Sequence, residues 1–427
     1  MLSQLLQSGL NLAVPSAPLG SVAVREHWTE EAAIVPGHGE ALRLDLLVRE
    51  GEAVAGGAPV ARLRDHPEIA LVAPMPGRVA KVHLGPGRQL HEIVLFRDAG
   101  GEVQTHDTAA ATAGDAAALR RLMQDSGLWR QLRARPFGHM PGPAAVPAAI
   151  LVMAADSRPL APDPLAMLEG RGEDLMRGLA ALGHLTEGPI YLCQPRGAAL
   201  AGPGAVEGRL RILHSGPRHP QGLAGHVLHH HHPASVAAPV WDIHAEDVAD
   251  LGALLATGLR PALRTVAVTG PALSEARLLR CQEGAHLAGL CHGLTLPGPH
   301  DLLSGSALDG RRAVWLAPRD RQLSVLPHHH GAPRGHWFRA ALSRAARPLP
   351  LIPTAALDQA LGGALPGMAL LRALSAGDDE TLDKLGGLTL LEEDLALADY
   401  VTGAEPRLAA LLRGALDRIA AEEGEGT

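Results

Sequence analysis

The stretch SGLWRQLRARPFGHMPGPAAVPAAILVMAADSRPLAPDPLAM, residues 126–167, decides how the rest of the chain is interpreted. It holds the densest group of aromatic and cationic side chains in a protein with only 2% aromatic residues. Three prolines between 141 and 147 then exclude a helix and lead into 148–154, an apolar run that predicts a buried strand. This strand ends at Asp156, before a proline-rich loop. Ligands of open α/β sheets bind at the carboxyl ends of strands, so we expect a binding site at this loop.

Length and charge limit the class of protein. A chain of 427 residues is long enough for two to four domains. Its net charge of −7 and scattered arginines argue against nucleic acid as a partner. No apolar run approaches the roughly 18 residues of a spanning helix, and the N-terminal residues lack the features of a signal peptide. We therefore expect a cytoplasmic protein with reduced thiols at Cys193, Cys281 and Cys291, and any membrane association to be peripheral.

Residues 20 to about 100 predict a small β-sandwich, because short apolar segments alternate with glycine- and proline-containing turns. The pattern VREGEAVAGGAPVARL followed by APMPGRVAKV resembles the biotinyl or lipoyl carrier fold. A carrier presents a modifiable lysine at the tip of its second hairpin. Here the tip is Met75-Pro76-Gly77, and Lys81 lies four residues farther along the chain. We expect a structural β-domain and no carrier function.

The middle of the chain alternates strands and helices, which is typical of a Rossmann-like α/β domain. A helix over 115–132, broken at Gly127, precedes it. The glycine-rich turn of a nucleotide-binding sheet is absent, and Asp156-Ser157-Arg158-Pro159 stands in its place. The predicted strands are 148–154, 189–193, 209–213 and 240–243, and the predicted helices are 163–183 and 245–257.

Residues 264–327 predict a β-grasp domain with the order ββ/α/ββ. A strand over 265–268 is followed by a helix-like segment over 276–290, and strand-like segments resume over 302–318 and 322–327.

Beyond Pro350 the pattern is helical, and the last helix places Leu408, Leu412, Ala415 and Ile419 on one face. The predicted helices are 365–374, 379–385 with Asp378 as its cap, 391–400 and 406–423. The fold class is therefore α+β multidomain, with a barrel-sandwich domain over 1–105, a Rossmann-like domain over 106–260, a β-grasp domain over 261–347 and a helical domain over 348–427.

The chain carries eight motifs in order along nearly its whole length: SGLWRQLRARPF, ADSRPLAPDP, LTEGPIYLC, RHPQGLAGHVLHHHHP, VWDIHAEDV, GPALSEARLLR, LSGSALDG and LEEDLALADYV. Together they resemble the NqrA family of the sodium-translocating NADH:quinone oxidoreductase. This resemblance implies a peripheral subunit on the cytoplasmic face of a bacterial inner membrane, in a six-subunit complex that passes electrons from NADH to ubiquinone and exports sodium. It implies that flavins and the iron–sulfur centre belong to partner subunits, that the chief partner is the large quinone-side membrane subunit, and that this chain binds no cofactor.

The chain departs from that family pattern in three places. A Cys-x-x-x-Cys-Pro-Gly pattern is replaced by 398–403, a tyrosine- and histidine-rich turn by 315–320, and a lysine after the RPF motif by His139. These differences leave open a second interpretation, in which the chain is a non-catalytic docking scaffold of a diverged Nqr- or Rnf-like membrane complex.

The cysteines and histidines do not predict a metal centre. Iron–sulfur ligation needs four clustered thiolates, whereas the three cysteines are scattered. The histidines at 226, 229–232 and 328–330 lack fixed acidic or cysteine companions, so we expect them in solvated loops. No serine or cysteine has the surroundings of a nucleophile, and we expect no catalytic residue in this chain.

A quinone headgroup needs an apolar or aromatic slot and a hydrogen-bond donor for each carbonyl oxygen. The opening stretch offers both kinds of side chain. The alternative is that its aromatic residues are core residues at a domain junction and that its arginines pair with acids. The candidate quinone-binding residues are Trp129, Arg133, Arg135, Phe137, His139 and Met140.

Overall fold

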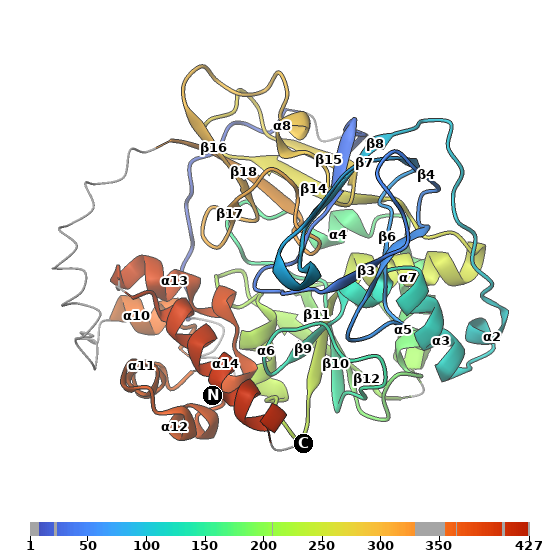
Figure 1. Ribbon diagram of the computed structural model, residues 1–427. Helices are drawn as coiled ribbons and strands as arrows, with labels where there is room; N and C mark the ends of the chain where they lie inside the picture. The colour runs from blue at the N-terminus through green and yellow to red at the C-terminus, as the bar shows by residue number, and fades with distance from the viewer. Residues whose placement is uncertain are drawn as a thin grey trace.

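The fold is described from a computed structural model. It describes residues 8–20, 24–206, 208–328, 355–363, 365–403 and 406–425. His329, His330 and the domain boundary expected at 347/348 lie outside the described residues. The described chain contains four sheets and a C-terminal group of helices, drawn in red in Figure 1 beside the sheets. This confirms the predicted α+β multidomain class, while the domain boundaries drawn from the sequence stay a prediction.

The N-terminal barrel-sandwich domain consists of two small antiparallel sheets. Met75, at the tip where a carrier has its lysine, is fully buried, and its sulfur lies 3.5 Å from the Gln282 amide nitrogen. A tip that packs against the neighbouring domain cannot swing between sites. One sheet has the order β2 (Glu31–Ile34), β8 (Leu90–Arg97), β7 (Gly77–Leu84) and β4 (Ala53–Val54), and the other β3 (Leu44–Leu46), β5 (Pro59–Leu63) and β6 (Ala70–Val72).

The α/β domain is built on a five-stranded sheet of order β12-β11-β10-β13-β9, in which only β9 runs antiparallel to its neighbour. Every residue of β10 is buried, because helices cover a parallel sheet on both faces. Its strands are β9 (Arg133–Arg135), β10 (Ala149–Met153), β11 (Ile190–Pro195), β12 (Leu210–Ser215) and β13 (Val240–His244). Its helices are α2 (Ala109–Thr112), α3 (Ala116–Asp125), α4 (Pro164–Met167), α5 (Gly172–Leu182), α6 (Ala224–His231) and α7 (Ala245–Thr257), with a short 3-10 turn over Leu128–Gln131.

The single helix predicted over 163–183 is wrong, because the structure has two helices there. Asp163 caps α4 by accepting from the backbone N–H of Leu165 at 2.9 Å. The chain then passes through Gly170, whose φ of +74° is a left-handed conformation that ends a helix. The apolar residues of 163–183 have helical spacing, but the chain forms two separate helices, α4 and α5.

The β-grasp domain has a six-stranded sheet of order β1-β15-β14-β18-β16-β17. The helix predicted over 276–290 is wrong in its first half. Leu279 and Cys281 are buried on one face of a strand that pairs antiparallel with β14, and only 287–290 is helical. The strands are β1 (Arg25–Glu26), β14 (Leu263–Thr269), β15 (Arg277–Gln282), β16 (His300–Ser304), β17 (Arg311–Arg312) and β18 (Gln322–Pro327), and the helix is α8 (Leu287–Leu290).

The C-terminal helices have their own apolar core. The predicted face of the last helix is confirmed, since Leu408 and Leu412 are fully buried, Ala415 is buried and Ile419 packs at its edge. The sequence did not predict the first helix of the group. The helices are α10 (Ala355–Ala360), α11 (Gly367–Ala376), α12 (Asp379–Lys384), α13 (Glu392–Thr402) and α14 (Leu408–Glu425), with a 3-10 turn over Gly387–Thr389.

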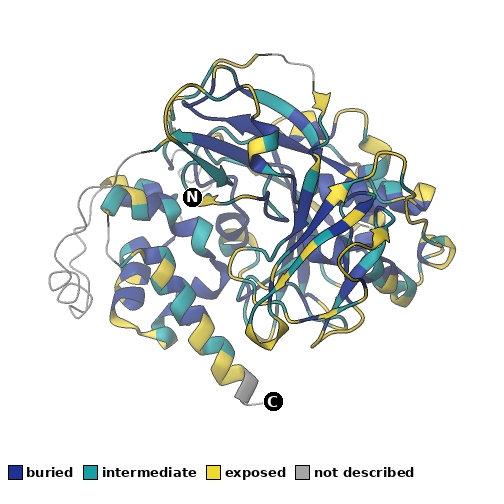
Figure 2. Cartoon of the chain, turned by 45° about the horizontal axis from the view of Figure 1, so that its top comes forward, coloured by how far each residue is buried: buried dark blue, intermediate teal, exposed yellow. Residues whose placement is uncertain are grey.

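Buried residues, dark blue in Figure 2, form a core within each part, and one hydrophobic cluster runs without a break from the barrel-sandwich domain into the α/β domain. Leu71 and Val79 belong to the first side of this cluster, and Leu119, Trp129 and Trp241 to the second. The two N-terminal domains therefore share a core and are expected to unfold together.

Arg135 joins the α/β domain to the C-terminal helices through a fully buried guanidinium group. Its Nε donates to Asp242 at 2.9 Å, and its Nη1 donates to Asp394 at 3.1 Å and to the Thr389 carbonyl at 2.6 Å. Its Nη2 lies 3.3 Å from Glu393. Asp242 and Asp394 are themselves buried, and Glu393 is partly buried, so the group compensates charges that water hardly reaches.

Replacing Arg135 with alanine leaves Asp242 and Asp394 as buried carboxylates that lack this cation. We expect Arg135→Ala to lower the free energy of unfolding by about 3–5 kcal/mol in denaturant titrations. Arg43→Ala is the control, because the Arg43–Asp65 pair is exposed, and its removal should cost less than about 1 kcal/mol. Equal effects of the two substitutions would show that the buried pairs do not hold the domains together.

Candidate functional site

A cavity of about 300 Å³ lies where the barrel-sandwich, α/β, β-grasp and C-terminal helical parts meet. We call it the junction cleft. Its α/β wall includes Met153 and Asp156 at the carboxyl end of β10, and Asp242 and His244 at the end of β13. The proline-rich loop that the sequence marks as a ligand position therefore lines this cleft, with Arg158 among its residues.

Most charges on the cleft wall are already paired across domains. Arg158 of the loop after β10 contacts Asp156 at 2.8 Å and Asp309 of the β-grasp domain at 2.7 Å. Arg319, also from the β-grasp domain, donates to Asp242 at 2.7 Å. These pairs fix the relative positions of the walls, so the cleft is formed before any ligand arrives.

His244 offers a free donor to the cleft. Its Nδ1 accepts from the backbone N–H of Glu246 at 3.2 Å and caps the first turn of α7. Burial and the neighbouring Arg321 lower the pKa of His244 to about 3, so the ring is neutral at physiological pH. Because Nδ1 accepts, the ring proton lies on Nε2. No partner for that N–H is found among the residues described.

Arg321 supplies a second free donor. Its Nε and Nη2 are used by Glu246 at 3.0 Å and Asp247 at 2.6 Å. Its Nη1 is buried and has no hydrogen-bond partner in the described part of the chain. Arg321 and His244 both line the cleft. An acceptor oxygen on a ligand would satisfy a buried donor that the protein leaves unsatisfied.

Carbon surfaces complete the cleft. Met153 and Ile243 stand at the strand ends, and Leu223, Leu308 and Ala317 face the cavity from neighbouring segments. The cleft therefore combines apolar patches with many charged side chains, most of them paired, and a few directed donors. Such a combination can bind flat ligands with acceptor oxygens, such as carbonyl compounds.

Of the six candidate quinone-binding residues, only Arg133 lines the junction cleft. Trp129 is fully buried, packs edge-on against Trp241 and donates its indole N–H to the Pro141 carbonyl at 2.8 Å. Arg135 is occupied by the carboxylates of the domain junction. Trp129 and Arg135 therefore fit the alternative stated for this stretch, in which the aromatic residues are core residues at a domain junction and the arginines pair with acids.

Phe137, His139 and Met140 do not line the cleft, although Gly138 between them does. Phe137 packs against the C-terminal core, and its carbonyl accepts from Arg413, a residue of the cleft wall, at 2.8 Å. His139 is exposed, with its ring 6.5 Å from that of Phe137. Met140 packs against the main hydrophobic core. The six-residue quinone pocket stays a prediction, and the structure brings Arg133 and the 137–139 turn to the same side of the cleft.

Sequence reasoning missed His244 and Arg321. His244 had a usable signal, since it follows a buried strand at the edge where α/β sheets bind ligands. Arg321 had no such signal in the sequence. It belongs to the β-grasp domain, and its partner Glu246 lies 75 residues earlier in the chain, so no local pattern links the two.

The histidine cluster predicted in solvated loops is instead largely helical. His226, His229, His230 and His231 belong to α6, and His226 is only 8% exposed. Leu228 and Val227 bury one face of this helix under β10, which is the reason that the segment folds as a helix. Within the described ranges no three His, Cys, Asp or Glu side chains are grouped as a metal site would require.

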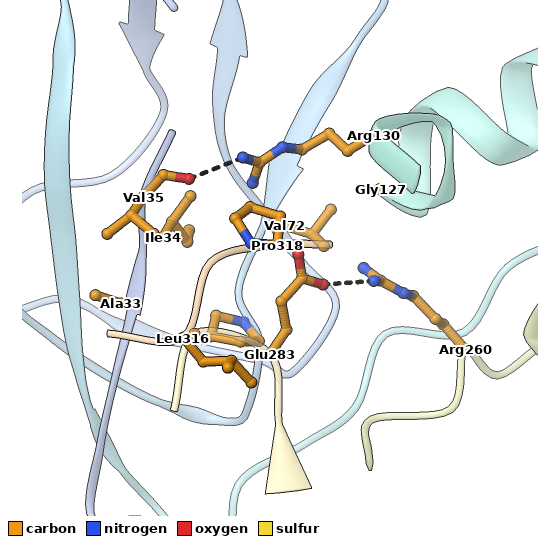
Figure 3. A pocket seen from close by; sticks show the side chains of 12 residues that line it. Ala33, Ile34, Val35, Val72, Gly127, Arg130, Arg260, Glu283, Leu316 and Pro318 are labelled. Atoms are coloured by element: carbon orange, nitrogen blue, oxygen red, sulfur yellow. Dashed lines mark hydrogen bonds and ion pairs between the residues drawn. The ribbon is translucent and has the colours of Figure 1, made fainter. Parts of the chain in front are cut away.

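A second, much smaller cavity of about 10 Å³, enough for one water molecule, lies at the junction of the first three domains. Figure 3 shows its two polar contacts, Arg260 with Glu283 at 2.7 Å and Arg130 with the Val35 carbonyl at 2.8 Å. Its size excludes an organic ligand, and its contacts fasten the barrel-sandwich domain to its neighbours.

The fold and the cleft define a multidomain α+β protein, with a barrel-sandwich hybrid domain ahead of an α/β domain whose strand ends line a cleft. Family models agree: residues 5–98 match the NqrA N-terminal barrel-sandwich hybrid domain, and residues 114–260 match the NqrA second alpha/beta domain. Among curated relatives, the A subunit of the Na(+)-translocating NADH-quinone reductase from Pseudomonas aeruginosa PAO1 is 30% identical over 98% of this chain and 99% of its own length. The protein of that name from Pasteurella multocida is 31% identical with the same coverage. The chain belongs to the NqrA family, the A subunits of the Na⁺-translocating NADH-quinone reductase, as its sequence motifs predicted.

No helix in the described ranges is both long enough and apolar enough to cross a bilayer.

The buried histidines make stability depend on pH. Burial, with lesser effects of neighbouring cations, lowers the pKa of His219 and His226 from 6.5 to about 4. The unfolded chain therefore binds more protons between pH 6.5 and 4, and stability falls as the pH falls through this window.

At pH 5 each buried histidine should cost about 2 kcal/mol relative to pH 7. We expect His226→Leu to reduce the difference in unfolding free energy between pH 7 and pH 5 by about this amount in denaturant titrations. His184→Leu, at an exposed position, serves as the control and should leave the difference unchanged. A wild-type protein equally stable at both pH values would contradict the assignment of neutral buried histidines.

Proposed function

We propose that this chain is a redox-silent peripheral subunit of a sodium-translocating NADH:quinone reductase complex, and that its junction cleft binds the ubiquinone headgroup. The relatives support membership of this complex, since proteins that match this chain along nearly their full length are named as its A subunit. The geometry of the cleft supports ubiquinone as its ligand. The observation that carries the proposal is the pair of unused donors, His244 Nε2–H and Arg321 Nη1, on a cleft with apolar walls.

A quinone ring fits this chemistry. Its faces are apolar and would pack on Met153 and Ile243, while its two carbonyl oxygens accept hydrogen bonds. Neutral His244 donates without adding charge, and Arg321 places a fixed positive charge near one carbonyl, which favours electron density on that oxygen. The cleft lies at the lower end of the size range of small-ligand pockets, roughly 300–1,000 Å³, so it suits a headgroup and leaves the isoprenoid tail outside.

The redox-silent role is supported by the thiols. Burial raises the pKa of Cys193 and Cys281 to about 12 and also raises the pKa of Cys291. Metal ligation and nucleophilic attack both need the thiolate, so protonated buried thiols suit neither. In this proposal flavins and the iron–sulfur centre reside in partner subunits, and this chain positions the acceptor of their electrons.

The proposed location is the cytoplasmic face of a bacterial inner membrane, where the chief partner is the large quinone-side membrane subunit. The tail of ubiquinone would remain in the bilayer while its headgroup reaches the cleft through this contact. No catalytic residue is assigned to the chain, because its side chains would bind and orient the quinone without exchanging electrons.

A second candidate is a docking scaffold that binds no quinone. One observation favours it: two arginines of the cleft wall, Arg133 and Arg319, already donate to Asp242. Their charges therefore stabilise the junction and are only partly available to a ligand.

Titration of the purified chain with ubiquinone-1 separates the two candidates. We expect saturable binding, and a roughly fivefold to tenfold weaker affinity for His244→Asn, because one buried hydrogen bond is lost. Asparagine is itself a good N-cap, so the variant keeps α7 capped while removing the donor from the cleft. Isothermal calorimetry measures both affinities.

His214→Asn is the matched control, since His214 lies exposed near the carboxyl end of edge strand β12 of the same sheet. It should bind ubiquinone-1 as tightly as the wild type. Absence of saturable binding in the wild type would favour the scaffold, and equal affinities of wild type and His244→Asn would exclude His244 as the donor.

A further inference from the structure

A third cavity, of about 270 Å³, lies between the barrel-sandwich domain and the α/β and β-grasp domains. We call it the tip cavity, because Pro74 and Pro76 flank the barrel-sandwich tip that would carry the lysine of a carrier domain. Its opposite wall is the segment 260–264, where the chain passes from α7 into β14 of the β-grasp domain. The junction cleft and the tip cavity share no lining residue.

The walls of the tip cavity are mainly carbon. Pro74, Pro76 and Pro261 contribute rigid rings, Val103 contributes an exposed isopropyl group, and Trp28 contributes the aromatic surface. Rigid apolar walls that lose little conformational entropy on binding favour a flat, hydrophobic ligand. Because the volume is small, this ligand has one or two rings.

One positive charge in the tip cavity lacks an anionic partner. The guanidinium carbon of Arg97 lies 4.9 Å from the centre of the Trp28 ring, and no carboxylate within the described ranges forms an ion pair with this arginine. A guanidinium held on an indole is pre-positioned and remains able to donate at its edge.

The other charges that line the cavity are largely compensated. Glu283 accepts from Arg260 at 2.7 Å and from Arg264 at 3.1 Å, so two cations share one carboxylate. Asp250 accepts from Arg171 at 2.7 Å. Asp98 at the rim is exposed and accepts from the backbone N–H of Gly100 at 3.1 Å. The Nε of Arg260 is buried without a hydrogen-bond partner among the described residues. The lining holds three arginines and three carboxylates, so its formal charge is balanced. The preference for an anionic group therefore rests on Arg97, which is held on the Trp28 ring, whereas Asp98 is exposed.

From these features we infer that the tip cavity is a second ligand site, which takes a planar aromatic carboxylate. The ring lies among Trp28 and the three prolines, and the carboxylate pairs with Arg97. The tip of the barrel-sandwich domain forms one wall of this site. Carrier domains attach a cofactor covalently at this tip, whereas in this protein the tip would contact a ligand that is bound non-covalently.

Isothermal calorimetry with naphthalene-2-carboxylate tests the inference on the full chain. We expect saturable binding by the wild type and an affinity roughly tenfold weaker or more in Arg97→Ala, since a charge-assisted hydrogen bond is lost. The neutral amide of the same ring system should bind wild type and Arg97→Ala with equal affinity. Arg49→Ala, at an exposed arginine of the same domain, should bind the carboxylate like the wild type.

Val103→Trp provides an independent variant, because Val103 is 50% exposed at the cavity wall and a larger side chain there fills the cavity without disturbing the core. It should abolish binding while the melting temperature stays unchanged. No saturable binding of naphthalene-2-carboxylate to the wild type, or equal affinities of wild type and Arg97→Ala, would overturn the inference. Displacement of the probe by ubiquinone-1, with loss of probe binding in His244→Asn, would place it in the junction cleft and would also overturn the inference.

Discussion

The buried carboxylate of Asp242 is the interaction on which the rest of the structure depends. Only 2% of the residue is exposed, and it accepts from Arg133 and Arg135 of strand β9 and from Arg319 of the β-grasp domain. These arginines hold the pKa of Asp242 far below its usual range, so the carboxylate is charged at every physiological pH. Burying such a group is costly unless its partners are fixed. The cost is offset only when β9, β13, the β-grasp domain and, through Arg135, the C-terminal helices occupy one arrangement. Charge pairing thus selects the relative positions of domains that apolar packing alone would specify less sharply.

The junction cleft follows from that arrangement. The domains that the arginines fasten together are the same domains that wall the cavity, so its shape is set by folding and not by the ligand. Pairing uses most of the charge on the cleft wall. It leaves a neutral imidazole at His244, one guanidinium nitrogen of Arg321, and the guanidinium groups of Arg311 and Arg407, for which no ion pair is found among the described residues. A site of this kind can hold a neutral ring with acceptor oxygens, which is the property that the proposed quinone-side role requires. The tip cavity differs in that the guanidinium of Arg97, which has no ion pair among the described residues, is held on the ring of Trp28.

Local pattern predicted much of this fold. The helix over Ala245–Thr257 has the predicted bounds, and β10 differs by one residue at each end, because a continuous apolar run and an amphipathic helix are decided by near neighbours. The segment 277–282 was misassigned because its apolar spacing fits helix and strand alike, and pairing with β14 decides between them. The site was predicted least well. Trp129 and Arg135 have the residue types of a quinone pocket, yet contacts more than 100 residues away in sequence, such as Asp242 and Asp394, determine that Arg135 is structural. No local pattern contains that information.

Hydrogen exchange of the backbone, measured with and without saturating ubiquinone-1, tests the central claim most directly. The account predicts slower exchange in the peptides that contain 153–158, 242–247 and 305–322, three of the segments that wall the junction cleft, with little change in β7 and β8 of the barrel-sandwich domain. Protection confined to other segments, or an unchanged exchange pattern under saturating quinone, would contradict a quinone site built from the carboxyl ends of these strands.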